Sequence, residues 1–153
     1  EPGVPLRQPQ RPCFREGART LGLAEGNAGL PELLLPRDRE CRAEAVRRWY
    51  IGLVERPTAL IVEGGTVASA IIEHFARRGL RVPEDLSVAA ISGGERPPRI
   101  IEGLARVEGR LHVMLQRGAR VLAENAGAAR RTVVREHLPA QWIPGTTCRA
   151  VAS

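Results

Sequence analysis

One stretch, residues 56–91, constrains the fold more than any other part of the chain. It opens with TALIV at 58–62, an uncharged run of mostly β-favouring residues, which two glycines interrupt. Apolar residues at helical spacing follow, and Gly79 marks where that helix ends. A second apolar run, LSVAAI at 86–91, completes the pattern. Strand, helix and strand of these lengths predict one right-handed βαβ unit, and therefore a parallel sheet in an α/β fold.

The wording of the same stretch resembles a known family. The tripeptide Pro57-Thr58-Ala59 precedes the first strand, and GLRVPEDLSV at 79–88 leads into the second. Both are similar to the effector-binding domain of LacI/GalR-type transcriptional regulators. The second motif is the more specific, because exported sugar-binding proteins share the fold but seldom this wording. The resemblance is weaker over the rest of the chain.

This resemblance implies a periplasmic-binding-protein-like architecture, an α/β three-layer sandwich with a mostly parallel sheet. In such regulators two subdomains close on a ligand, and a separate head grips or releases DNA. By this comparison residues 13–153 are part of the effector-binding and dimerisation domain, mostly its C-terminal subdomain. Residues 1–12, rich in proline, form an extended or disordered lead-in. The first subdomain and the DNA-binding head are expected to be absent from this chain.

Periodicity predicts the remaining elements less sharply. Thr66 is the expected N-terminal cap of the helix in the βαβ unit. Apolar residues at helical spacing, and short apolar runs between turns, predict further helices at 14–23, 39–54 and 108–125 and strands at 32–35, at 104–107 and from 132.

The charge balance does not by itself indicate nucleic-acid binding. The chain has 153 residues and a formal net charge of +6, and all 23 of its basic residues are arginine. Many occur in scattered pairs such as Arg47-Arg48, Arg77-Arg78 and Arg130-Arg131, which favours a solvated surface over one binding patch. With no apolar stretch long enough for a membrane span and no leader at its start, the chain is expected to be cytoplasmic, with no membrane partner.

No arrangement of residues indicates catalysis. His74, His112 and His137 are isolated from any nucleophile or carboxylate at a motif spacing. The three cysteines are widely spaced, which argues against a zinc site. No phosphate-binding glycine motif is present. The chain is therefore not expected to be an enzyme, nor to hold a metal or a cofactor.

A ligand site is expected where the parallel strands end, because open α/β sheets bind ligands beyond the carboxyl ends of their strands. In the family, polar side chains at these strand ends form hydrogen bonds to the ligand. The resemblance aligns those positions mostly with small residues of this chain. Two interpretations stay open: a retuned pocket for a different effector, or tight turns at a site that has lost its ligand. The candidate ligand-binding residues are Gln10, Arg11, Glu63, Gly64, Gly65 and Ser92.

The family resemblance also implies a homodimer through the helix of the βαβ unit. Val67, Ala70, Ile71 and His74 lie along one stripe of that helix. The alternative is that these same residues pack on the sheet.

The predicted function is therefore the effector-binding and dimerisation part of a DNA-binding transcriptional regulator. Its partners would be a small-molecule effector, such as a sugar or a sugar derivative, and operator DNA contacted through the missing head. The alternative is a periplasmic-type binding protein for small molecules such as sugars, with the same fold.

Overall fold

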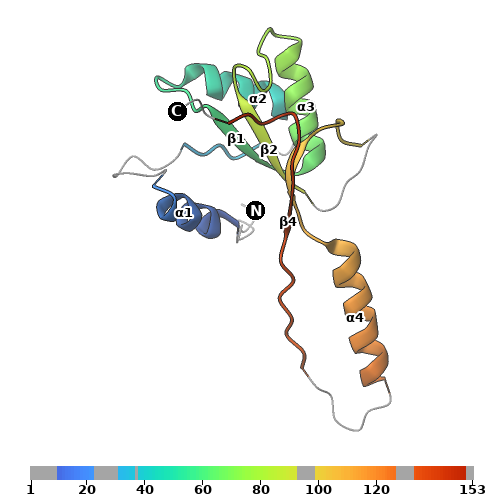
Figure 1. Ribbon diagram of the computed structural model, residues 1–153. Coiled ribbons are helices and arrows are strands. Elements are labelled where there is room, and N and C mark those ends of the chain that lie inside the picture. The colour runs from blue at the N-terminus through green and yellow to red at the C-terminus, as the bar shows by residue number, and fades with distance from the viewer. Residues whose placement is uncertain (1–9, 23–30, 37, 93–98, 127–132, 151–153) are drawn as a thin grey trace, which may run out of the picture. The chain divides into compact units, whose positions relative to one another are not determined.

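The computed structural model describes residues 10–22, 31–36, 38–92, 99–126 and 133–150 (Figure 1). The chain divides into two compact units, residues 1–34 and residues 35–153. Within the described residues, the first unit contains one helix, α1, and the second contains three helices and the sheet.

Helix α1, Gln10–Thr20, begins earlier than the pattern predicts. Residues 10–12 of the expected lead-in are helical, and Pro12 is tolerated there because backbone N–H groups in the first turn have no partner within the helix. Residues 1–9 lie outside the described residues. The strand expected at 32–35 is wrong, since residues 31–36 adopt no regular structure. Prolines at both ends of this segment remove backbone donors that a sheet would need.

The second unit is built on one four-stranded sheet, in the order β1-β2-β3-β4. The first three strands are parallel, and β4 is antiparallel to β3. The predicted βαβ unit and the mostly parallel α/β sheet are thereby confirmed. The strands are Ala59–Glu63 (β1), Ser87–Ser92 (β2), Ala105–Glu108 (β3) and Gln141–Ile143 (β4).

Two helices, α2 (Arg39–Gly52) and α3 (Gly65–Ala76), pack against each other, and α3 also packs on β1 and β2 (Figure 1). The core between them contains Phe75, whose ring centroid lies 6.2 Å from that of Tyr50. With so few aromatic residues, aliphatic side chains fill the rest. The largest fully buried side chains are Phe75, Ile71, Leu86, Leu104 and Val88.

Helix α3 is bounded by glycines in left-handed conformations. Its N-cap is Gly64, with φ of 96°, and no side chain caps the helix. The prediction that Thr66 caps it is therefore wrong: the Gly64 N–H donates to Ile91 O at 2.8 Å, which ties the turn to β2 and starts the helix at Gly65. At the other end Gly79, with φ of 81°, stops the helix as predicted.

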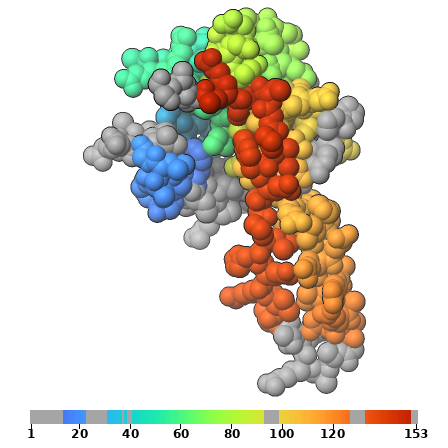
Figure 2. Space-filling model, viewed as in Figure 1, coloured from blue at the N-terminus to red at the C-terminus, as the bar shows by residue number. Residues whose placement is uncertain are grey.

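Helix α4, Leu111–Asn125, follows β3 and has no buried residue. It starts later than the pattern predicts because Glu108 still belongs to β3. In Figure 2 the helix, in orange, lies beside residues 133–140, and Arg117 Nε is 3.8 Å from Glu136 Oε1. The strand expected from residue 132 is not formed at 133–134, and residue 132 itself lies outside the described residues. The apolar side chains that α4 exposes are Leu111, Met114, Leu115 and Leu122.

The segment after β4 returns to the amino ends of β2 and β3. Thr147, only 5% exposed, links both strands. Its hydroxyl accepts a hydrogen bond from Ala105 N–H at 2.9 Å and donates one to Val88 O at 2.7 Å. Its carbonyl accepts a third from Val88 N–H at 2.8 Å. Together these bonds tie the segment after β4 to the first residues of β2 and β3.

The motif PEDLSV contains a carboxylate with a structural role. Asp85 accepts hydrogen bonds from the Arg81 guanidinium at 2.7 Å and from the Arg81 backbone N–H at 2.8 Å. These bonds, the guanidinium first, lower the pKa of Asp85 from 3.8 to about 2. A carboxyl whose pKa is lower in the folded state contributes stability above its unfolded pKa and loses it as pH falls towards the folded value.

We therefore expect the melting temperature of the wild-type chain to fall between about pH 4 and about pH 2, and that of Asp85→Asn to fall less over the same range. Melting curves recorded across this range check the prediction. Glu84→Gln is the matched control, because Glu84 is an exposed neighbouring carboxylate. It should keep the wild-type pH dependence, and equal slopes for wild type and Asp85→Asn would contradict the assignment.

Candidate functional site

Four of the six predicted ligand-binding residues lie at the carboxyl edge of the sheet. Glu63 ends β1 and is paired in register with Ile91. Gly64 and Gly65 follow Glu63 into α3, and Ser92 follows Ile91 at the end of β2. Parallel pairing thus brings two separate parts of the chain to one edge, as the sequence predicts.

The other two, Gln10 and Arg11, open α1 in the first unit. Their role in ligand binding stays a prediction. Ser92 is 3% exposed, so its hydroxyl is not open to solvent. Glu63 is exposed and has no hydrogen bond or ion pair within the described part of the chain.

A polar row crosses three strands on the face of the sheet that contains Ser92. Ser92 is paired in register with Glu108, and Glu108 with Gln141. Glu108 is 6% exposed, and its Oε2 lies 3.3 Å from Arg106 Nε. A buried carboxylate requires such a partner, because an unpaired buried charge costs several kcal/mol. Sequence reasoning missed Glu108, although a charged residue directly after an apolar run at a strand end was the available signal.

A second row crosses all four strands on the opposite face, since side chains alternate along a strand, and its members on β2, β3 and β4 are apolar. In register it runs from Glu63 to Ile91, then to Val107, then to Trp142. Val107 is 37% exposed and Trp142 is 52% exposed. At this edge Ser92 and Glu108 are thus buried on one face, whereas Val107 and Trp142 are exposed on the other, against the usual preference.

The predicted dimer stripe on α3 divides into two kinds of residue. Ile71 is fully buried within the unit, so it packs on the core and is not available to a second chain. Ala70 is exposed, and Val67 and His74 are half-buried. The structure therefore leaves Val67, Ala70 and His74 at the surface, where the dimer contact stays a prediction.

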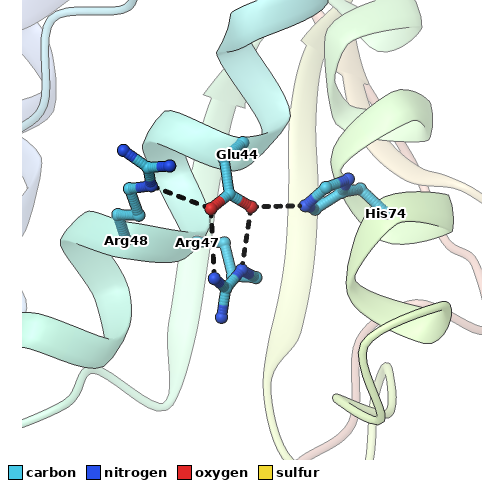
Figure 3. Close-up of polar contacts among 4 residues, drawn as sticks. All are labelled: Glu44, Arg47, Arg48 and His74. Atoms are coloured by element: carbon cyan, nitrogen blue, oxygen red, sulfur yellow. Dashed lines mark hydrogen bonds and ion pairs between the residues drawn. The ribbon is translucent and has the colours of Figure 1, made fainter.

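His74 belongs to a charged cluster that joins α3 to α2 (Figure 3). His74 Nε2 lies 2.9 Å from Glu44 Oε2. The same carboxylate accepts hydrogen bonds from Arg47 at 2.9 Å and from Arg48 at 2.8 Å. These three partners hold the pKa of Glu44 well below its ordinary value, with Arg47 contributing most. The cluster holds α3 against α2 in the last turn of α3.

Comparison with known protein families decides what kind of domain this is. Residues 7–148 match the model of the periplasmic binding protein-like domain. The chain belongs to this family. The resemblance to the effector-binding domain of LacI/GalR-type regulators, drawn from the sequence, is confirmed, and so is the fold class.

Individual relatives of this periplasmic binding protein-like domain are regulators or resemble them in fold. The chain is 32% identical over 84 residues to the HTH-type transcriptional repressor PurR of Photobacterium profundum, covering 52% of this chain and 25% of that protein. A LacI family transcriptional regulator from Bifidobacterium animalis subsp. lactis has a TM-score of 0.68 and 23% identity, over 94% of this chain and 50% of that one. An uncharacterized protein from Actinobacillus succinogenes has the same TM-score and 15% identity, over 92% and 49%.

The periplasmic binding protein-like chain therefore spans about half the length of these solved structures, and a quarter of the curated repressor. Its described residues contain no group of three or more His, Cys, Asp or Glu side chains able to hold a metal ion. None of the helices in that described part is long and apolar enough to cross a membrane. The edge of the sheet offers hydrogen bonding, one open carboxylate and apolar contact, which suit binding.

Proposed function

We propose that this chain is the effector-binding and dimerisation part of a DNA-binding transcriptional regulator, in which ligand binding changes operator affinity. The family and the regulators among its relatives support the proposal. The periplasmic-type sugar-binding alternative gains no support from those relatives. Operator DNA would be contacted by a head outside residues 13–153, so the partners are a small-molecule effector and DNA.

The single observation that carries the proposal is that β3 and β4, two paired antiparallel strands, lead out of the sheet and back into it. β3 leaves the sheet towards α4, and β4 returns antiparallel beside it. The elements between them, α4 and residues 133–140, expose apolar side chains, among them Leu122 at 74% and Val133 at 84%. Such a surface needs a covering body. A first subdomain, packed on α4 and joined through these two strands, would close over the carboxyl edge of the sheet.

The effector would lie at that edge, against Glu63 and the backbone of Gly64 and Gly65, and Gln10 and Arg11 would be further ligand-binding residues. Ser92 would shape the site from the other face of the sheet, where it lies buried beside Glu108. A second copy of the chain would contact Val67, Ala70 and His74 on α3. A ligand that binds the closed state more tightly than the open state would shift the dimer between two DNA affinities. The protein would act in the cytoplasm and would not catalyse a reaction.

The test is a thermal-shift screen of the complete gene product against sugars, sugar phosphates, nucleosides and amino acids, followed by a mobility-shift assay with its upstream DNA. Binding to the folded state raises the melting temperature by mass action. A ligand at a hundredfold excess over its Kd adds about 2.7 kcal/mol to the free energy of unfolding. We expect at least one compound class to raise it and to change the affinity for DNA.

Residues 13–153 alone serve as the control and should not shift DNA specifically, because the head would be missing. Specific DNA binding by that fragment would contradict the proposal that a head outside residues 13–153 contacts the operator. A complete gene product that binds no DNA, with or without ligand, would contradict the regulator itself.

A further inference from the structure

The segment that leads into β3 is held by a side chain of α3. Residues 99–104 belong to no helix or strand, and Ile100 and Leu104, 3% and 0% exposed, anchor them in the core. Between these two anchors the Ile101 backbone N–H donates a hydrogen bond to Ser69 Oγ at 3.0 Å. A helix side chain thus supplies the acceptor that a neighbouring strand would otherwise provide.

The Ser69 hydroxyl is fixed in direction. Ser69 is 5% exposed, and its Oγ donates a hydrogen bond to Gly65 O at 2.9 Å, one turn earlier in α3. Because a hydroxyl has only one hydrogen, this bond leaves the oxygen lone pairs for the Ile101 N–H. The position of Ile101 therefore depends on the position of the Gly65 carbonyl.

Gly65 belongs to the candidate ligand edge. The preceding Gly64 N–H donates to Ile91 O at 2.8 Å, which ties the start of α3 to the end of β2. Through Ser69 the same helix is also tied to Ile101. The first two turns of α3 are thus bonded to the chain on both sides of residues 93–98, so a displacement at the edge would act on both contacts.

The same turns of α3 contain part of the proposed dimer surface. Val67 is half-buried and Ala70 is exposed, and both lie within two residues of Ser69. On the segment that Ser69 holds, Arg99 and Glu102 are exposed and carry opposite charges. In a two-fold symmetric dimer a surface meets its own copy, so opposite charges on it can pair across the axis.

We propose that Ser69 is a positioning residue that couples the ligand edge to the dimer surface. Its hydroxyl holds residues 99–102 against the first two turns of α3, so a change at Gly64 and Gly65 reaches the surface that a second copy would contact. The inference rests on the proposed function, because it names a residue through which effector binding would act on the dimer.

The first test removes the hydroxyl in the complete gene product. Ser69→Ala deletes both hydrogen bonds and keeps a small side chain. We expect amide hydrogen exchange in residues 99–104, measured by mass spectrometry, to become about fivefold faster. The dimer dissociation constant, measured by sedimentation equilibrium, should also rise about fivefold.

Ser87→Ala is the matched control. Ser87 is 8% exposed and accepts a hydrogen bond from the Arg149 N–H at 3.2 Å, at the amino end of β2. This variant should lower the melting temperature about as much as Ser69→Ala does. It should leave the exchange of residues 99–104 and the dimer dissociation constant at their wild-type values, which separates positioning from a general loss of stability.

A double-mutant cycle tests the coupling without a ligand. Gly64→Ala strains the turn at the edge, because alanine rarely adopts the φ of 96° found there. While Ser69 is present, this strain should speed the exchange of residues 99–104 about threefold. In the Ser69→Ala background the same change should add less than about 1.5-fold, since the connection is already broken.

Three outcomes would overturn the inference. The first is a Ser69→Ala protein that exchanges and dimerises like the wild type. The second is an equal effect of Ser87→Ala, and the third is additive effects in the double-mutant cycle. In each case a wild-type gene product that dimerises and binds its upstream DNA would leave the proposed function intact. A wild-type gene product that stays monomeric would contradict the proposed dimerisation together with this inference.

Discussion

Replacing Gly145 by alanine is expected to lower the free energy of unfolding by more than about 3 kcal/mol, because a new methyl group would meet backbone that cannot move aside. A Cβ built at Gly145 overlaps Gly103 O and comes within 2.5 Å of Ala105 N and 2.7 Å of Leu104 C. The returning segment would have to separate from the start of β3. Urea unfolding followed by circular dichroism measures the change.

The matched control is the same substitution in a helix. Gly118 lies inside α4, and nothing lies within 4 Å of a Cβ added there. Gly118→Ala should raise stability by about 0.5–1 kcal/mol, since alanine is the better helix former. If Gly145→Ala were as stable as the wild type, the close approach of the two segments would be refuted.

Thr147→Val is expected to lower the free energy of unfolding by about 2 kcal/mol, although the two side chains have nearly the same shape. The valine leaves the buried Ala105 N–H without its acceptor, now 2.9 Å away in Thr147 Oγ1. It also removes the hydroxyl donor to Val88 O. A buried donor without a partner costs more than a lost contact between apolar groups.

Thr146→Val provides the comparison, because Thr146 is the exposed neighbour and its hydroxyl forms no recorded hydrogen bond within the described chain. Its stability should stay close to that of the wild type. Equal losses for the two variants would contradict a special contribution of the buried Thr147 hydroxyl. Because residues 103–108 and 141–147 are the two segments that leave and re-enter the sheet, Gly145→Ala and Thr147→Val should also weaken any coupling between effector and DNA.

The βαβ unit could be predicted closely from the sequence because each of its signals is local. The apolar run before Gly64, the helical spacing to Phe75 and the stop at Gly79 each depend on residues a few positions apart. The prediction of the helix start failed because a contact with a residue distant in the sequence sets it. The helix cap moved from Thr66 to Gly64 because Gly64 N–H bonds to β2.

The candidate site was only half visible in the sequence. Glu63 and Ser92 could be placed because parallel strands end at a common edge. Which face each side chain occupies, and how exposed it is, depends on register and on what packs above. Pairing across β3 and β4 therefore revealed Glu108 as a buried carboxylate and Trp142 as an open aromatic ring.

The sequence by itself determined the family and the parallel βαβ unit, since these follow from local periodicity and from motif wording, and it predicts the edge at which a ligand would bind. Only the tertiary structure decided that Ser92 and Glu108 are buried on one face of this edge and that Val107 and Trp142 are exposed on the other. It also decided that Ile71 belongs to the core. Burial and cross-strand register are properties of segments far apart in the chain, and no local pattern of residues encodes them.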